Sequence, residues 1–236
     1  MPAEKANASL PRKINERYHV VKLLGELENH GRAVQEAESF FRRHPRSPWL
    51  DEVIFLQVQS LYATGRYEAA REAGEALVKR KFPREDGRAG LAWSPWRDHM
   101  RYLAGKIHHI QGNLAEAVRL YREVAGRFVD AKDSLDFFTR AELDAPATRS
   151  FGLDDAAAFE LGLKNQTSIR VRLYPVDLKV LFAVRKNLAN VNAIDLTGIP
   201  AVATFERSAA DAEPYVRFTR ELKLPIPRQG VYLVVM

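Results

Sequence analysis

A repeat at a fixed offset constrains this chain more than any other feature of its sequence. Ser47-Pro48-Trp49 begins a segment that continues through Gly65 and Ala70, and Ser94-Pro95-Trp96 begins a second segment that continues through Gly112 and Ala117. Matched residues lie 47 positions apart. Such a repeat is typical of helical hairpins that bury a continuous core by stacking on one another. The sequence therefore predicts a helical array, a fold that generally binds other proteins.

Helix signals divide the array into units of two helices. In the second unit Ser47 is the expected N-cap and Pro48 the expected first helical residue. Proline has no backbone N–H, but an N–H at the first helical position would have no partner within the helix, so nothing is lost there. The pattern predicts helices over 48–63 and 67–80 in the second unit, and over 95–111 and 114–128 in the third. A less regular first unit is expected over 14–30 and 33–44, with its turn at Gly31 and with Ala37 and Phe41 at the equivalent places, and a closing helix over 130–143.

This pattern resembles the tetratricopeptide repeat, which has a period of about 34 residues and small residues at its close helix crossings. The resemblance covers about residues 14–128. It rests on Gly25, Gly65, Ala70, Pro83, Gly105, Gly112, Ala117 and Tyr121. Two departures stand out: Arg101 occupies a place where the repeat prefers a large aromatic residue, and an insertion over 83–93 separates the second and third units. The 47-residue offset is then the family period plus this loop, which is either a surface excursion or part of a binding face.

If the resemblance holds, the first helix of each unit lines a concave groove that binds a protein or peptide partner. The candidate groove residues are Glu52, Phe55, Gln59 and Tyr62 in the second unit and His99, Tyr102, Lys106 and His109 in the third. Each set has spacings of three and four, which places it on one helix face. The alternative is that the aromatic residues only pack between neighbouring helices while the others are solvated. The basic clamp for a peptide carboxylate is not reproduced, because Lys106 stands nearly alone.

Composition excludes several chemistries. The chain has no cysteine, which rules out disulfides, thiolate metal sites and cysteine nucleophiles. No two histidines are spaced by four on one helix face, so no metal site and no cofactor is expected. Nucleophile elbows and phosphate-binding glycine loops are also missing. We expect a protein without catalytic activity; an enzyme that uses His99 or His109 is the remaining alternative.

Charge and hydropathy bear on partners and compartment. The net charge is +6, but lysines and arginines alternate with acids along the chain, so nucleic-acid binding is not expected. The run Lys79-Arg80-Lys81 fits a solvated helix end, where cations complement the helix dipole. No apolar run is long enough to cross a membrane, and the first 18 residues do not resemble a signal peptide. The sequence leaves the compartment open, with the cytoplasm as the default expectation.

Apolar residues alternate with a period of two after residue 156, which indicates β structure. The expected strands cover 159–163, 169–174, 216–222 and 231–235, and Asn165 lies in a turn between the first two. A helix that opens at Pro175 and Asp177 is expected after the second strand, with Leu178, Leu181, Phe182 and Leu188 on its apolar face. These elements predict an antiparallel β domain, most simply a sandwich.

The β segment resembles the first macroglobulin domain of bacterial alpha-2-macroglobulin-like proteins. The resemblance covers about residues 154–236 and rests on the runs 159–165, 169–178, 193–199 and 224–235, which include Tyr174-Pro175-Val176-Asp177-Leu178 and Gly230-Val231-Tyr232-Leu233-Val234-Val235. In some of these proteins a helical-repeat segment precedes the domain. The family implies trapping or inhibition of proteases, a periplasmic or envelope location, and in some members a thioester formed by cysteine and glutamine.

The chain departs from that family because it has no cysteine for a thioester and none of the later domains that carry the bait region. We therefore expect a non-catalytic amino-terminal part of such an inhibitor, partnered by further macroglobulin domains of the same or a split polypeptide. A stand-alone tetratricopeptide adaptor is the alternative. The predicted fold is α+β and multidomain, with a tail over 1–13, a helical repeat domain of about three hairpins over 14–143, a linker over 144–153 and a small, incomplete β-sandwich with one inserted helix over 154–236.

Overall fold

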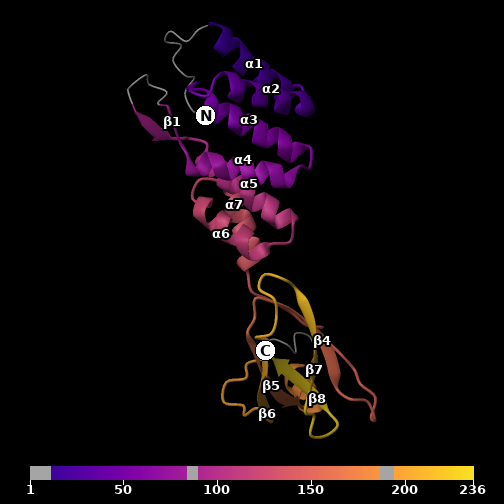
Figure 1. Cartoon of the computed structure of the whole chain (residues 1–236). Coiled ribbons are helices and arrows are strands. Elements are labelled where there is room, and N and C mark those ends of the chain that lie inside the picture. The colour runs from indigo at the N-terminus through magenta and orange to yellow at the C-terminus, as the bar shows by residue number, and fades with distance from the viewer. Residues whose placement is uncertain (1–11, 84–89, 187–193) are drawn as a thin grey trace. The chain divides into compact units, whose positions relative to one another are not determined.

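Helices precede antiparallel sheets along the chain (Figure 1). The computed structural model describes residues 12–83, 90–186 and 194–236, and the side chains of residues 12–15 and 185 lie outside that description. Contacts divide the chain into two compact units, Met1–Asp136 and Phe137–Met236. The α+β class expected from the sequence is confirmed. The division between the units falls at residue 136, earlier than the expected linker over 144–153.

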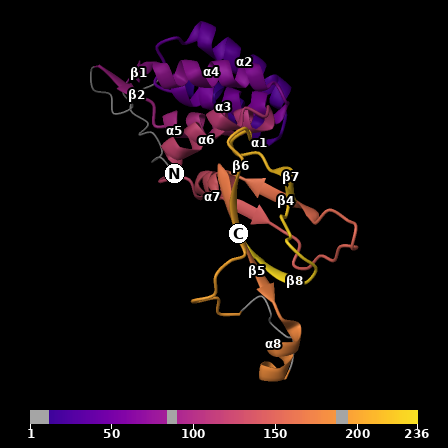
Figure 2. The ribbon, with the colours of Figure 1, turned by 90° about the horizontal axis from the view of Figure 1, so that it is seen from below.

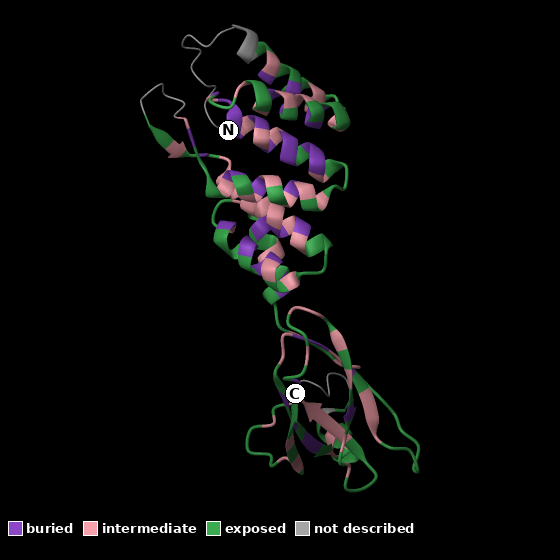
Figure 3. Cartoon of the chain, in the orientation of Figure 1, coloured by how far each residue is buried: buried purple, intermediate pink, exposed green. Residues whose placement is uncertain are grey.

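From α1 to α6 each helix packs on the next one in sequence, and α1 also packs on α3. The helices are α1 (Arg12–Glu26), α2 (His30–Arg43), α3 (Leu50–Ala63), α4 (Tyr67–Lys79), α5 (Arg97–Ile110), α6 (Leu114–Val124) and α7 (Val129–Thr139). Buried residues run along α3, which packs between its neighbours (Figure 3). Its core residues Val53 and Val58 are at most 1% exposed. One apolar cluster therefore joins the successive helices.

Three turns with nearly the same backbone geometry join the paired helices. The residue before each second helix has φ between −82° and −80° and ψ between 59° and 64°; these residues are Asn29, Arg66 and Asn113. The N–H group of each donates to a carbonyl five residues earlier, at 2.8, 2.9 and 2.8 Å. The three units are therefore offset by 37 residues and then by 47. The second offset is the one that the sequence predicted.

The turn of the first unit lies earlier than predicted. Glu28 has a φ of 56°, the left-handed value that Gly65 and Gly112 take in the other two turns. Gly31 instead lies inside α2. A non-glycine residue in this conformation costs about 1–2 kcal/mol, so glycine is the residue expected at such a turn. The prediction of Gly31 as the turn was wrong.

This shift also changes the equivalent small residue of the first unit. Ala33, rather than Ala37, lies 37 residues before Ala70, and the alanines at 33, 70 and 117 are all fully buried. Gly105 allows a similarly close approach between α5 and α6. A Cβ atom at Gly105 would lie 3.0 Å from Cε1 of Tyr121, tighter than nine in ten such contacts in proteins. Small residues therefore set the distance between neighbouring helices.

The two Ser-Pro-Trp cassettes form a turn before each helix. The Ser47 hydroxyl accepts a hydrogen bond from the Trp49 N–H at 3.2 Å, and the Ser94 hydroxyl accepts one from the Trp96 N–H at 3.1 Å. Helices α3 and α5 begin only after these tryptophans. The predicted helix starts at Pro48 and Pro95 were therefore two residues early. Both serine side chains are buried, so the turn belongs to the core.

The end of the helical segment differs from its prediction. Helix α6 ends at Val124 instead of residue 128, and α7 covers Val129–Thr139 instead of 130–143. Residues Glu142–Asp144 form strand β3. Glu142 accepts a hydrogen bond from the Lys164 ammonium at 2.6 Å, and Lys164 is only 4% exposed. This buried charge draws residue 142 into the sheet, which helix periodicity alone did not reveal.

The predicted insertion between the second and third units contains a short antiparallel hairpin. Strand β1 (Lys81–Pro83) pairs with β2 (Leu91–Trp93), with Lys81 opposite Trp93. Phe82 is 2% exposed and anchors the hairpin in the core of the first unit. Residues 84–89 of the insertion lie outside the described part of the chain.

The second unit contains two three-stranded antiparallel sheets, in the orders β3-β4-β7 and β6-β5-β8. The remaining strands are β4 (Ala158–Lys164), β5 (Ser168–Val176), β6 (Ala203–Ser208), β7 (Phe218–Lys223) and β8 (Val231–Val235). Both sheets contribute to one apolar cluster, with Leu163 of β4 and Leu173 of β5 fully buried. Alternate residues of β5 are buried, as the period of two predicted.

The four predicted strands are confirmed as β4, β5, β7 and β8, while β3 and β6 were not predicted. Helix α8 (Leu178–Arg185) follows β5, as expected, and extends away from the strands (Figure 2). The Asp177 carboxylate caps it by accepting N–H groups of Lys179 and Val180 at 2.9 and 3.1 Å. Leu188, predicted on its apolar face, lies outside the described residues. The run 194–199, likened above to a macroglobulin strand, forms no strand.

Candidate functional site

All eight predicted groove residues lie on α3 and α5, the first helices of the second and third units. They form four equivalent pairs at the 47-residue offset: Glu52 with His99, Phe55 with Tyr102, Gln59 with Lys106, and Tyr62 with His109. The structure divides them between two roles. Some pack against neighbouring helices, and the others remain on the surface.

Phe55 and Tyr102 belong to a series of stacked aromatic pairs. Phe55 stacks on Trp96 with ring centroids 4.0 Å apart, and Tyr102 stacks on Phe128 at 5.2 Å. In the first unit Tyr18, at the position equivalent to Phe55, stacks on Trp49 at 4.5 Å. Each pair joins the first helix of one unit to the residue that directly precedes the first helix of the next. These stacks hold successive units together.

Only the tryptophans of these stacked pairs could be identified from the sequence. Trp49 and Trp96 were recognised as parts of a repeated cassette, but their stacking partners were not identified. Phe128 lies 32 residues after Trp96 and lacks the preceding Ser-Pro, so an offset of 47 could not find it. The usable signal was an aromatic residue directly before each first helix. Phe55 is only 9% exposed, so it fits the alternative in which the aromatic groove candidates pack between neighbouring helices.

Three groove candidates form a half-buried cluster across two units, named here the Tyr–Lys cluster: Tyr62, Tyr102 and Lys106. The Lys106 ammonium lies 5.1 Å from the ring centroid of Tyr62 on α3 and 5.7 Å from that of Tyr102 on its own helix. Both distances fall within the range of cation–π attraction. Tyr62 also contacts Tyr67 of α4 at 5.6 Å. The cluster thus presents two aromatic surfaces and one cation.

Burial raises the pKa values of two tyrosine hydroxyls near Lys106. Burial, followed by the nearby Asp130 carboxylate, raises the pKa of Tyr102. Burial also raises the pKa of Tyr121, which lies behind Tyr102, to about 12. Both phenols therefore stay neutral at physiological pH. Within the part of the chain that the structure describes, Lys106 forms no ion pair with a carboxylate, so its charge is available to an acidic group.

The other candidates divide in the same way. The Glu52 carboxylate accepts a hydrogen bond from the Tyr18 hydroxyl at 2.6 Å, which joins α3 to α1. Gln59 and His109 are exposed. These contacts leave the Tyr–Lys cluster, with Gln59 beside it on α3, as the part of the predicted groove that presents a surface to a partner.

His99 is packed among aromatic rings. Its ring lies 4.8 Å from Phe128, 5.2 Å from Trp96 and 5.7 Å from Phe55. Its Nδ1 atom is buried without a hydrogen-bond partner, and burial lowers the pKa of His99. A neutral, half-buried imidazole of this kind suits packing. Searched over the described residues, the chain holds no group of three histidine, aspartate or glutamate side chains that could bind a metal ion.

A separate cavity of about 280 Å³ lies on the other side of α3. Its floor includes Leu50, Ile54 and Gln57, with Phe41 of α2 and Ala73 of α4 at its sides. At 100° per residue, this face of α3 is about 120° away from the face of Phe55 and Tyr62. The cavity therefore does not belong to the predicted groove.

Comparisons with known proteins assign no family. No protein-family model matches the chain, and no curated protein is significantly similar to it. Among the described residues, no helix is both long and apolar enough to span a membrane.

Proposed function

We propose that the helical unit is a binding scaffold that holds a protein or peptide segment across the Tyr–Lys cluster. One observation carries the proposal: a lysine without a carboxylate partner among the described residues lies between two half-buried tyrosines that come from two successive units. Tyrosine contributes large contact area at low entropy cost, and interface hot spots are enriched in it.

The chemistry of the cluster selects the kind of segment that fits it. Tyr62 and Tyr102 would contact an apolar or aromatic side chain, and Lys106 would pair with a carboxylate. An ammonium that is already held by two rings loses little entropy when it forms such a pair. The preferred ligand is therefore a segment with an acidic residue next to an apolar one.

Features of both units support the two family resemblances expected from the sequence. The three equivalent turns and the buried alanines support a tetratricopeptide-like solenoid. The two sheets around one cluster support a small macroglobulin-like sandwich. We infer a non-catalytic amino-terminal part of a bacterial alpha-2-macroglobulin-like protease inhibitor, without bait and thioester regions. The alternative is a stand-alone adaptor that uses the same groove.

A peptide library tests the binding role. Random dodecapeptides displayed on phage are selected on the full chain, and the selected peptides are titrated against variants Tyr62→Ala/Tyr102→Ala and Lys106→Gln. We expect selected sequences to combine acidic and apolar residues and to bind the double variant at least tenfold more weakly, which corresponds to about 1.4 kcal/mol. Lys132→Gln, an exposed lysine of α7, is the matched control. Equal binding by all variants, or no selected peptide, would place binding elsewhere.

Genomic context separates the two proposed identities. The inhibitor reading requires coding sequence for further β domains next to this one, in the same or a split polypeptide. The adaptor reading requires none.

A further inference from the structure

Positive charge is concentrated in one short segment around the β1–β2 hairpin. Residues 79–97 contain six lysines and arginines but only two acids, so this segment carries four of the six net charges of the whole chain. The sequence predicted basic residues interspersed with acids along the whole chain and a helix end at Lys79 to Lys81. Lys81 instead lies in β1, opposite Trp93 of β2.

The hairpin presents an exposed face that combines apolar and basic groups. Because side chains alternate along a strand, Phe82 points into the core while Leu91 and Trp93 point outward. Leu91 is 61% exposed and Trp93 is 48% exposed. Both views show the hairpin extending beyond the helices of the first unit (Figures 1 and 2). Exposed tryptophan and leucine in such a position are typical of a recognition surface.

Three cations of this segment are held over aromatic rings. The Arg97 guanidinium lies 4.1 Å from the Trp93 ring centroid, the Lys81 ammonium lies 5.2 Å from the same ring, and the Arg80 guanidinium lies 5.2 Å from the Phe82 ring. Arg97 also donates from Nε to the carbonyl of Val78 at 3.1 Å. This bond fixes the guanidinium and leaves its two terminal nitrogens directed elsewhere. The cations are therefore preorganised.

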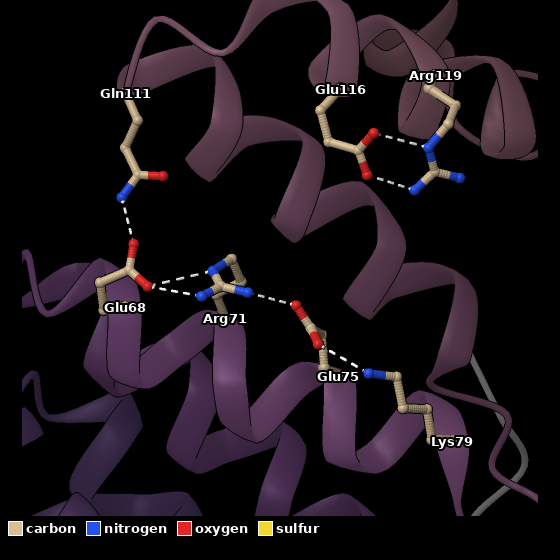
Figure 4. Close-up of polar contacts among 7 residues, drawn as sticks. All are labelled: Glu68, Arg71, Glu75, Lys79, Gln111, Glu116 and Arg119. Carbon is tan, nitrogen blue, oxygen red and sulfur yellow. Dashed lines mark hydrogen bonds and ion pairs between the residues drawn. The ribbon is translucent and has the colours of Figure 1, made fainter.

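Several cations on the faces of α4 and α6 form ion pairs with glutamates instead. Arg71 pairs with Glu68 and Glu75, and Lys79 pairs with Glu75 at 2.9 Å (Figure 4). Arg119 pairs with Glu116 at 2.5 Å in the same view. By contrast, Arg80, Lys81 and Arg97 form no ion pair with any described carboxylate. Ion pairs thus neutralise these cations of α4 and α6, whereas Arg80, Lys81 and Arg97 keep their charges available to an external anion.

We propose that the β1–β2 hairpin face is a second binding site, which takes an acidic segment of a partner protein that also carries apolar residues. Carboxylates of the segment pair with Lys81 and Arg97, and an apolar side chain packs on Leu91 and Trp93. The exposed Leu91 and Trp93 lie beside these cations, so a protein segment that combines acidic and apolar residues fits the site. The site lies on the insertion and is independent of the Tyr–Lys cluster.

Fluorescence anisotropy of a labelled peptide tests the site. The full chain is titrated with an octapeptide of six glutamates and two leucines, and with the same peptide carrying glutamine for glutamate. We expect the glutamate peptide to bind at least tenfold more tightly. The variant Lys81→Gln/Arg97→Gln should lose about tenfold in affinity, since each charge-assisted contact is stronger than a neutral one. Lys81→Gln/Trp93→Ala keeps the bond from Arg97 to Val78 and should show a similar loss.

Matched variants make the result decisive. Arg122→Gln/Lys132→Gln removes two exposed cations from α6 and α7 and should bind the glutamate peptide within twofold of the parent. Lys106→Gln should also bind normally, which separates this site from the proposed groove. An equal loss in the Arg122/Lys132 control, equal binding of both peptides, or no binding at millimolar peptide overturns the proposal. Tighter binding of single-stranded oligothymidine or of phosphatidylglycerol vesicles, lost in the hairpin variants, would overturn it in favour of a nucleic acid or a membrane.

Discussion

The stack of Phe55 on Trp96 allows a quantitative test of how the helical units are coupled. The rings lie 4.0 Å apart between centroids and are inclined by 16°, and Phe55 is 9% exposed. The perturbation is a double-mutant cycle of Phe55→Leu and Trp96→Leu. Leucine keeps much of the apolar volume at each position but cannot stack, so the cycle isolates the contact between the rings.

The structure sets the expected magnitude. Aromatic pairs contribute about 0.5–1.5 kcal/mol beyond the burial of their area, and these rings are closer than most such pairs. We expect a coupling energy of about 1 kcal/mol. Each single substitution should cost more than that, about 1–3 kcal/mol, because a partly filled site also loses packing contacts.

The assay is urea unfolding of the full chain, followed by circular dichroism at 222 nm, where the helical unit dominates the signal. The control cycle combines Phe55→Leu with Val124→Ala. Val124 is fully buried on α6 of the same unit and is not part of the apolar cluster that includes Phe55 and Trp96. Distant sites add to within about 0.5 kcal/mol, which sets the threshold for a real coupling. A Phe55–Trp96 coupling no larger than that of the control cycle would show that the stack does not join the units.

Three further perturbations test other contacts. Gly105→Ala should destabilise the helical unit by about 1–3 kcal/mol in urea titrations, because its Cβ would lie 3.0 Å from Tyr121, whereas Gly25→Ala, with open space around it, should be neutral or slightly stabilising. Lys164→Met should cost about 1–3 kcal/mol in the same assay, since it removes the hydrogen bonds to Glu142 and to the Phe137 carbonyl; an unchanged midpoint would contradict this. Burial lowers the pKa of His99, so the stability it contributes is present above pH 6.5 and is lost as the pH falls further. The melting temperature of His99→Phe should therefore fall less between pH 7.5 and 5.5 than that of the parent, and parallel curves would contradict this.

The helical unit was predictable where the local conformation requires a particular residue type. A glycine at 65 or 112 fits the left-handed turn, and buried alanine at 70 or 117 fits a close crossing, so the second and third units were found with correct turns. The first unit was misplaced because Glu28 tolerates the same φ at some cost in strain. Its register follows from packing across helices, and that information is not local to the turn.

The β unit shows the complementary case. Strands β4 and β5 alternate apolar and polar residues and were predicted, whereas β6 reads Ala-Thr-Phe-Glu-Arg-Ser and alternates too weakly to stand out. Strand β3 is only three residues long and owes its place to the hydrogen bond from Lys164 to Glu142. Elements held by long-range polar contacts leave no periodicity in the sequence.

The candidate sites follow the same logic and explain what the Ser-Pro-Trp cassette does. The serine hydroxyl closes a buried turn across the proline, and the tryptophan that follows stacks on the preceding unit. Trp96 covers Phe55. Tyr62 lies on the same face of α3, two turns further along, and presents its ring to Lys106. The residue that couples the units thus removes one aromatic side chain from the groove. The Tyr–Lys cluster is the part of the groove that remains available to a partner. Lys106→Gln changes this cluster and leaves the Phe55–Trp96 contact intact, so the groove can be tested without disturbing the stack.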